Sequence, residues 1–533
     1  MIFRNRPRGN RVTGTAPGIL LLYLLDAVLL TIPISLILIW LYRRTVERAM
    51  RSSAPGGNAA AAETTSPARR PQNPSEFAQR ERHSRLRLAL VYAVAGACAA
   101  AFWAWLYFHE PGLEFSGLRG FVVWYVLGWP VPATLITALA VPRRRALWII
   151  GAYLLGGVLI IVGWSVIPYL VSGQPGMRAV ENVRSFFSFL AIEAVPPALL
   201  IIIASYRRIR GVSPLALAAL LVFTFSSFAA LEIFVTLVDV GGLRKLLLAV
   251  GPNWWFMLAT VPVGYICWRL LALLNARYRH KSFSDVQLVA DSFWLIVAFV
   301  ISAEFAGQFG WKGIAGLGGF VVYRTVAQLG LSISSRRTLQ EPGRRLLVLR
   351  VFGFRGRSEK LFDSVAQRWR FRGGVAMIAG TDLAARTMDP DDTLAFLAGE
   401  LQSRFVRGPQ DLQDHLMRMD ESPDPDGRFR VTEFFCYENT WSDTLAALLR
   451  RSDAILMDLR GFSEKNSGCT FELKQLSSQQ RLGDTVFVVD ASSDLKLLES
   501  TIGGSESTHL RLEKVESQAS SARERVYRSL CLP

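Results

Sequence analysis

Long apolar runs alternate with short polar segments over the first 335 residues of the chain. A helix that crosses a membrane needs roughly 20 consecutive apolar residues, and about nine segments meet this condition. They are residues 18–42, 86–108, 119–141, 147–171, 186–206, 214–238, 252–274, 286–308 and 313–332. This pattern predicts a polytopic α-helical membrane region over residues 18–335.

Two stretches of the N-terminal part lack this apolar pattern. Residues 1–17 are basic, and residues 43–85 contain a run rich in Ala, Pro, Ser, Thr and Arg. Low-complexity polar sequence buries too little apolar surface to offset the entropy of ordering. We therefore expect a basic N-terminal segment and, after the first predicted span, a disordered cytoplasmic linker over residues 43–85.

The pattern changes near Arg336, where short apolar runs begin to alternate with amphipathic stretches. After a linker over residues 336–345, strands are predicted at 346–352, 375–379, 429–437, 454–459 and 485–489. Helices are predicted at 358–369, 389–405, 442–451 and from Cys469 onward. Such alternation predicts a mainly parallel sheet covered by helices on both faces. The fold class is therefore multi-domain, a membrane bundle followed by an α/β domain over residues 346–533.

Composition and charge add a location to this picture. The chain has 533 residues, 51% of them hydrophobic, and a net charge of +17, which excludes an ordinary soluble enzyme. Arginine-bearing loops at 142–145, 207–210, 275–281 and 334–345 can all face one side, and such loops stay in the cytoplasm. We expect an integral protein of a plasma membrane, such as a bacterial inner membrane, with a cytoplasmic C-terminal domain.

The side of the N-terminus stays open, because its arginines conflict with this orientation. The basic residues are not interleaved with aromatic residues on a folded face, so the charge favours the lipid bilayer over nucleic acid as a partner. The cysteines and histidines show no metal-binding or disulfide spacing, and no Walker A or dinucleotide-binding glycine motif follows a strand. We expect neither a metal ion nor a bound cofactor.

Ionisable residues inside the predicted spans indicate either a transport pathway or buried pairs. On two consecutive spans, Glu304 and Arg324 are expected to neutralise each other. The others are Asp26, Glu193, Glu232, Arg269 and Asp291.

One segment of the C-terminal domain carries candidate chemistry. The strand from Ala454 to Leu459 is followed by a polar loop and by a helix with Glu472 in its first turns. An open α/β sheet presents a carboxylate at its ligand-binding edge in this way. Glu472 is the candidate catalytic residue, and the candidate ligand-binding residues around it are Arg355, Arg357, Arg460, Ser463, Asn466, Ser467 and Gly468. The helix start offers N–H groups to hydroxyls or phosphate, and the arginines offer charge to a pyrophosphate.

The same residues resemble known families. The stretch from Val351 through Ile378 resembles the start of TIR domains, and Ser463, Ser467, Cys469, Glu472 and Leu473 resemble their glutamate-bearing stretch. Gly468, Glu472 and Leu473 are also similar to a motif of nucleoside deoxyribosyltransferases. The resemblance implies a Rossmann-like fold in which the glutamate acts at an N-glycosidic bond, with NAD or a nucleoside as substrate rather than cofactor.

Three functions stay open at this point. The chain is a membrane-anchored N-glycosidase that takes a nucleotide ligand, a non-catalytic membrane sensor or signalling scaffold, or a transporter regulated by the TIR-like domain. In each case the C-terminal domain is a candidate for homo-oligomerisation. A purely structural alternative for Glu472 is a glutamate favoured by the helix dipole, with Cys469 as core packing.

Overall fold

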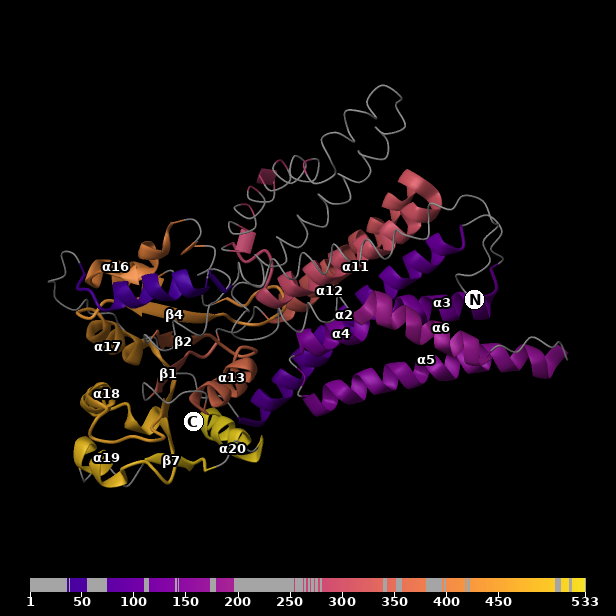
Figure 1. The fold of residues 1–533 in the computed structure, drawn as a ribbon. Coiled ribbons are helices and arrows are strands. Elements are labelled where there is room, and N and C mark those ends of the chain that lie inside the picture. Colours follow the sequence, from indigo (N-terminus) through magenta and orange to yellow (C-terminus); the bar gives the residue numbers. More distant parts are fainter. Residues whose placement is uncertain are drawn as a thin grey trace. The chain divides into compact units, whose positions relative to one another are not determined.

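The structure is a computed structural model, and it is mostly helical with a parallel sheet in the C-terminal part (Figure 1). It divides into two compact units, one of residues 1–39, 88–332 and 389–394, the other of residues 40–87, 333–388 and 395–533. The described residues are 36–37, 39–54, 74–109, 115–139, 141, 143–172, 179–195, 280–338, 343–350, 357–379, 395–396, 399–417, 419, 422–503, 510–516 and 520–532, with single positions between 254 and 278.

Three helices among the described residues are long and apolar enough to cross a membrane. They are Glu81–Tyr107 within α2 (Pro74–Tyr107), Arg144–Val166 within α5 (Arg143–Ser172) and Lys312–Ile333, which takes in most of α12 (Gly318–Thr338). These helices correspond to three of the predicted spans. The predicted spans 18–42, 214–238 and 252–274 lie largely outside the described residues.

A fourth predicted span is a bent pair. Helices α3 (Gly117–Leu127) and α4 (Pro130–Ala138) meet at an angle of 41°. Pro130 is the first residue of α4, where its missing N–H and fixed φ start a helix but cannot continue the previous one. Two predicted spans remain. The span 286–308 corresponds to α11 (Asp285–Phe309), which contains the shorter apolar segment Val286–Ser302. The span 186–206 is described only at its start, in α6 (Ala179–Phe189) and the π-helical turn Leu190–Ala194.

Stacked aromatic rings form the core of this helical unit. The ring of Trp294 lies 5.8 Å from that of Trp103 and 4.5 Å from that of Tyr323. Both indole N–H groups donate hydrogen bonds, Trp103 to the carbonyl of Gly316 at 2.8 Å and Trp294 to the hydroxyl of Thr134 at 2.9 Å. Each of the two indole rings is therefore buried with its N–H donor satisfied.

Arg324 forms an ion pair with a carboxylate that the sequence did not assign to it. Its Nε lies 3.9 Å from Asp291 Oδ2 on α11, and the predicted pairing with Glu304 stays a prediction. Residue spacing within each helix could not show which turn of α11 meets α12.

Seven parallel strands form the sheet of the second unit, in the order β3-β4-β2-β1-β5-β6-β7. The strands are β1 (Leu346–Arg350), β2 (Val375–Ile378), β3 (Phe405–Val406), β4 (Val431–Cys436), β5 (Ala454–Asp458), β6 (Thr485–Val489) and β7 (Arg511–Lys514). Every residue of β5 and β6 is buried, as expected of parallel strands covered on both faces.

Alternate residues of each strand feed two separate cores. On β1, Leu346 and Val348 pack with helices α13 (Arg357–Trp369) and α20 (Ser520–Cys531). Leu347 and Leu349 pack in the other core, with helices α16 (Pro409–Met417), α17 (Trp441–Arg451), α18 (Ser467–Ser478) and α19 (Leu495–Ile502). Figure 1 shows α13 and α20 on one side of the sheet and α17, α18 and α19 on the other.

The predicted strands at β1, β2, β4, β5 and β6 and the predicted helices at α13, α17 and α18 are confirmed. The predicted helix over residues 389–405 is wrong at its C-terminal end. Gly399 has a φ of 73°, which ends helical geometry, and Phe405 belongs to β3, where it pairs with Phe435. Residues 389–394 lie outside the described residues.

Both ends of the predicted linker 43–85 differ from a disordered chain. Residues 39–50 and Pro74 onward are helical, and Tyr42 and Val46, one turn apart, are fully buried. After the helix of residues 39–50, the chain contacts the α/β domain, because Ala54 N donates a hydrogen bond to Asn439 Oδ1 at 2.9 Å. An apolar face at helical spacing explains this order, and the composition-based argument overlooked it.

Candidate functional site

The strand order reverses beside β1, which has β2 on one side and β5 on the other. Ligands of open α/β sheets bind outside the carboxyl ends of the strands at such a reversal. The loop after β1, residues 351–356, lies outside the described residues. On the β5 side of this reversal, the loop after β5 and the loop after β6 are described.

A buried ion pair lies at the carboxyl end of β5. Arg460 donates from Nε to Asp458 Oδ1 at 2.8 Å and from NH2 to Oδ2 at 2.7 Å, and the two residues are 4% and 5% exposed. Burial disfavours the guanidinium charge, but hydrogen bonds and charge from Asp458, with a further contribution from Asp490, raise the pKa of Arg460. The guanidinium is therefore held in a fixed geometry.

Asp490, directly after β6, ties the two loops together. Its Oδ1 accepts from Gly461 N at 3.2 Å, from Ser492 N at 3.0 Å and from the hydroxyls of Ser492 and Ser493 at 2.6 and 3.2 Å. The Ser493 hydroxyl also donates to the carbonyl of Leu459 at 2.9 Å. Partial burial opposes the charge of Asp490, but these hydrogen bonds outweigh it and lower the pKa of the carboxyl group.

Asp490→Asn is expected to make the α/β domain less stable by about 1 kcal/mol at pH 7. Because the folded-state pKa is below the ordinary value, the carboxylate's contribution is present above about pH 4 and is lost as pH falls through the folded-state pKa. Thermal midpoints of the full chain at pH 7 and near pH 3 measure this. A difference between variant and wild type that is larger at pH 3 would contradict the assignment.

The turn before α18 brings together several residues that the sequence singled out. Asn466 Oδ1 accepts from Ser463 N at 2.9 Å and from the Ser463 hydroxyl at 3.1 Å, and Asn466 is the N-cap residue of α18. Ser467 and Gly468 are the first two residues of that helix, and a Cβ added at Gly468 would meet no atom within 4 Å. The turn is thus ordered by its own side chains and is open beside Gly468.

Glu472 lies in the second turn of α18 and is 4% exposed. It shares the buried face of the helix with Cys469, Leu473 and Leu476, which belong to the core on that side of the sheet. Burying a carboxylate costs several kcal/mol unless other groups compensate. Glu472 is therefore a carboxylate on the core-facing side of the helix that follows β5.

Two of the predicted arginines are not placed. Arg355 lies outside the described residues, and Arg357 begins α13 with a side chain outside them. The ligand roles of both residues, and of Arg460, stay predictions.

Asp458, Asp490, Ser492 and Ser493 were not singled out from the sequence. The two aspartates could have been identified from the sequence, because each stands at the end of a buried strand and these strand ends lie at the same edge of the sheet. Their partners could not be derived in the same way, because Gly461 and Asp490 are 29 residues apart.

Within the described ranges, no group of three His, Cys, Asp or Glu side chains is arranged to hold a metal ion. Comparison of the chain with models of protein families, with curated proteins and with solved structures found no match in any of the three.

Proposed function

We propose that this chain is an integral membrane protein whose cytoplasmic α/β domain binds a nucleotide at the carboxyl edge of its sheet and cleaves an N-glycosidic bond with Glu472. The observation that carries the proposal is the buried carboxylate on α18, the helix that follows the strand β5 beside the reversal of strand order. A carboxylate at this edge stands where open α/β sheets bind nucleotides. NAD and nucleosides are the candidate substrates.

The chemistry suits a single carboxylate. Cleaving the bond between a base and ribose builds positive charge on the sugar ring, and a nearby carboxylate stabilises or traps that oxocarbenium-like centre. A buried position strengthens the interaction, because the effective dielectric constant there is lower than in water. The ordered turn of Ser463 and Asn466 lies at the start of the same helix, where ribose hydroxyls or phosphate oxygens can meet N–H groups.

The membrane placement rests on the three apolar helices together with the arginine-bearing loops. The C-terminus is expected in the cytoplasm, because those loops favour that side. A cytoplasmic reporter enzyme and a reporter active only outside the cytoplasm, each fused after Pro533, measure this. We expect activity from the first reporter, and activity from the second would overturn the orientation of the α/β domain.

A second function, a non-catalytic membrane signalling module, is favoured by one observation. Glu472 shares its helix face with core residues Cys469 and Leu473, so the carboxylate would then serve only local structure. In this case the domain would act through contacts with a second copy or another protein. Catalysis is the test that separates the two proposals.

The experiment is an assay of membranes that contain the full chain. They are incubated with NAD and, separately, with a set of nucleosides, and the release of nicotinamide or free base is followed by chromatography. Membranes from the same host with an empty vector are the control. Release above the control supports the N-glycosidase, whereas the absence of release from all substrates favours the signalling module.

A further inference from the structure

Helix α2 (Pro74–Tyr107) belongs to both compact units of the chain. Its residues 74–87 are part of the unit that holds the sheet, whereas residues 88–107 are part of the helical unit, and the candidate span runs from Glu81 to Tyr107. A single continuous helix thus joins a candidate membrane span to the α/β domain. The contacts of residues 74–87 therefore determine how α2 is held by the domain.

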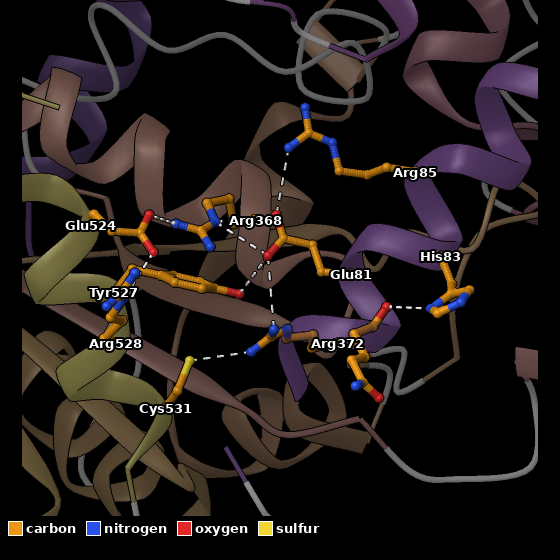
Figure 2. A network of polar contacts seen from close by, with 10 residues as sticks. Glu81, His83, Arg85, Arg368, Arg372, Glu524, Tyr527, Arg528 and Cys531 are labelled. Atoms are coloured by element: carbon orange, nitrogen blue, oxygen red, sulfur yellow. Dashed lines mark hydrogen bonds and ion pairs between the residues drawn. The ribbon is translucent and has the colours of Figure 1, made fainter. Parts of the chain in front are cut away.

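The carboxylate of Glu81 is the centre of those contacts (Figure 2). Arg368 on α13 donates from Nε to both carboxylate oxygens, at 3.1 and 3.2 Å, and Arg372 NH2 lies 3.8 Å from Oε2. The Tyr527 hydroxyl on α20 donates to Oε2 at 3.3 Å. Glu81 is 6% exposed. Two helices of the domain therefore hold one side chain of α2.

Further contacts fix the groups that hold Glu81. The Arg368 guanidinium lies 3.7 Å from the centre of the Tyr527 ring and also pairs with Glu524 on α20. Arg372, whose side chain is 3% exposed, donates from NH1 to Cys531 Sγ at 3.2 Å. Burial and the nearby charge of Glu81 raise the pKa of Tyr527, so its hydroxyl stays protonated and remains a donor.

Separating Glu81 from its partners on α13 and α20 costs free energy. Removing Glu81 takes a carboxylate from both Arg368 and the buried Arg372, while Arg368 keeps its pair with Glu524, and a buried charge that loses a partner is destabilising. By contrast, the pair of Arg528 with Glu524 on α20 is exposed, and such pairs contribute little. Separation of Glu81 from α13 and α20 is therefore expected to carry an energetic cost.

We infer that the α13–α20 face is a docking surface for residues 74–87 of α2, and that the contacts of Glu81 act as its latch. Through this contact, α2 transmits a rotation of the membrane span to the α/β domain. The inference rests on the proposed membrane placement of α2 and not on the proposed catalysis. A turn of the span about its axis turns Glu81 with it, because a continuous helix is stiff over a few turns. The latch then opens, and α13 and α20 lose a common partner.

Hydrogen–deuterium exchange on the full chain in membrane nanodiscs tests the latch. Glu81→Gln keeps the size and helix propensity of the side chain but removes its charge. We expect amides of α13 and α20 to exchange at least about tenfold faster, because local opening becomes easier. Amides of β6 are expected to stay unchanged and serve as an internal reference. Glu499→Gln, at an exposed glutamate on α19, is the matched control and is expected to leave all these rates unaltered.

Insertion of alanines after Arg87 tests the coupling itself. Each added residue turns the two parts of a helix by about 100° relative to each other. Two alanines turn Glu81 by about 200° relative to the span, whereas four turn it by about 400°, roughly 40° past a full turn. Fast exchange in α13 and α20 is expected with two alanines, and exchange close to wild type with four.

Two results would overturn the inference. Unchanged exchange in Glu81→Gln would show that the carboxylate does not hold the surface. Equal exchange in both insertion variants would show that the span does not set the position of Glu81. Neither measurement depends on substrate turnover, so failure of the proposed N-glycosidase activity would leave both results interpretable, and the reporter fusions test the membrane placement separately.

Discussion

Replacing Glu472 with glutamine is expected to lower the rate of N-glycosidic cleavage by on the order of 100-fold or more. Glutamine keeps the size and helix propensity of glutamate but carries no charge, so it cannot stabilise the positive charge that develops on the ribose ring. The same assay of nicotinamide or base release measures the effect. Substrate binding is expected to change much less, because the charge on the sugar is present only near the transition state.

Stability separates this effect from a folding defect. Glu472 is almost fully buried, and glutamine keeps its size, its shape and a side-chain oxygen that accepts hydrogen bonds, so the packing around it is retained. The thermal midpoint of Glu472→Gln is therefore expected to stay near that of wild type. Glu464→Gln, at an exposed glutamate in the loop between β5 and α18, is the matched control and should retain full turnover. Full turnover in Glu472→Gln itself would remove this residue from the mechanism.

The central strands of the sheet could be predicted from the sequence because they are buried on both faces. The strands Ala454–Asp458 and Thr485–Val489 contain the continuously apolar runs 454–457 and 486–489, and both predicted strands agree with the structure within about one residue. The edge strands were missed for the opposite reason. Strand β3 has two residues, and β7 (Arg511–Lys514) alternates partly buried with exposed positions and carries three charged residues.

The turn before α18 and the carboxylate of Glu472 could be predicted because strand, loop and helix follow one another directly in the sequence. The other parts of the edge come from different loops. Asp490 bonds to Gly461 across 29 residues, and hydrogen-bonding residues of this kind are fixed only when the two strands lie side by side.

The linker between the first two predicted spans also depends on contacts with residues far away in the sequence. Composition argued for disorder over residues 43–85, but Glu81 lies on a helix and its partners Arg368 and Tyr527 are 287 and 446 residues away. A glutamate in a polar, arginine-rich stretch carries no mark of burial in the sequence. Only the folded α13–α20 face supplies the charges that make its burial favourable.

Arg460 has two alternative roles, because its guanidinium can stabilise the fold by pairing with Asp458 or can bind the charge of a ligand. Its guanidinium forms two hydrogen bonds with Asp458, and both groups are buried, so Arg460→Met is expected to destabilise the α/β domain by about 3–5 kcal/mol by leaving Asp458 without a partner. For a domain of this size the thermal midpoint should fall by about 6–20 °C. Thermal unfolding of the full chain, followed by the near-ultraviolet signal, measures the shift.

A second substitution shows whether the loss comes from the pair. The double variant Asp458→Leu with Arg460→Met removes both charges, and we expect it to recover more than half of the lost midpoint, since apolar residues can replace a buried pair at little cost. Arg525→Met is the control, because Arg525 is 56% exposed and its carboxylate partner is 3.8 Å away, and we expect a change within about 0.5 kcal/mol. If Arg460→Met instead keeps the wild-type midpoint and weakens substrate binding, the guanidinium serves the ligand and the pair with Asp458 is only its resting position.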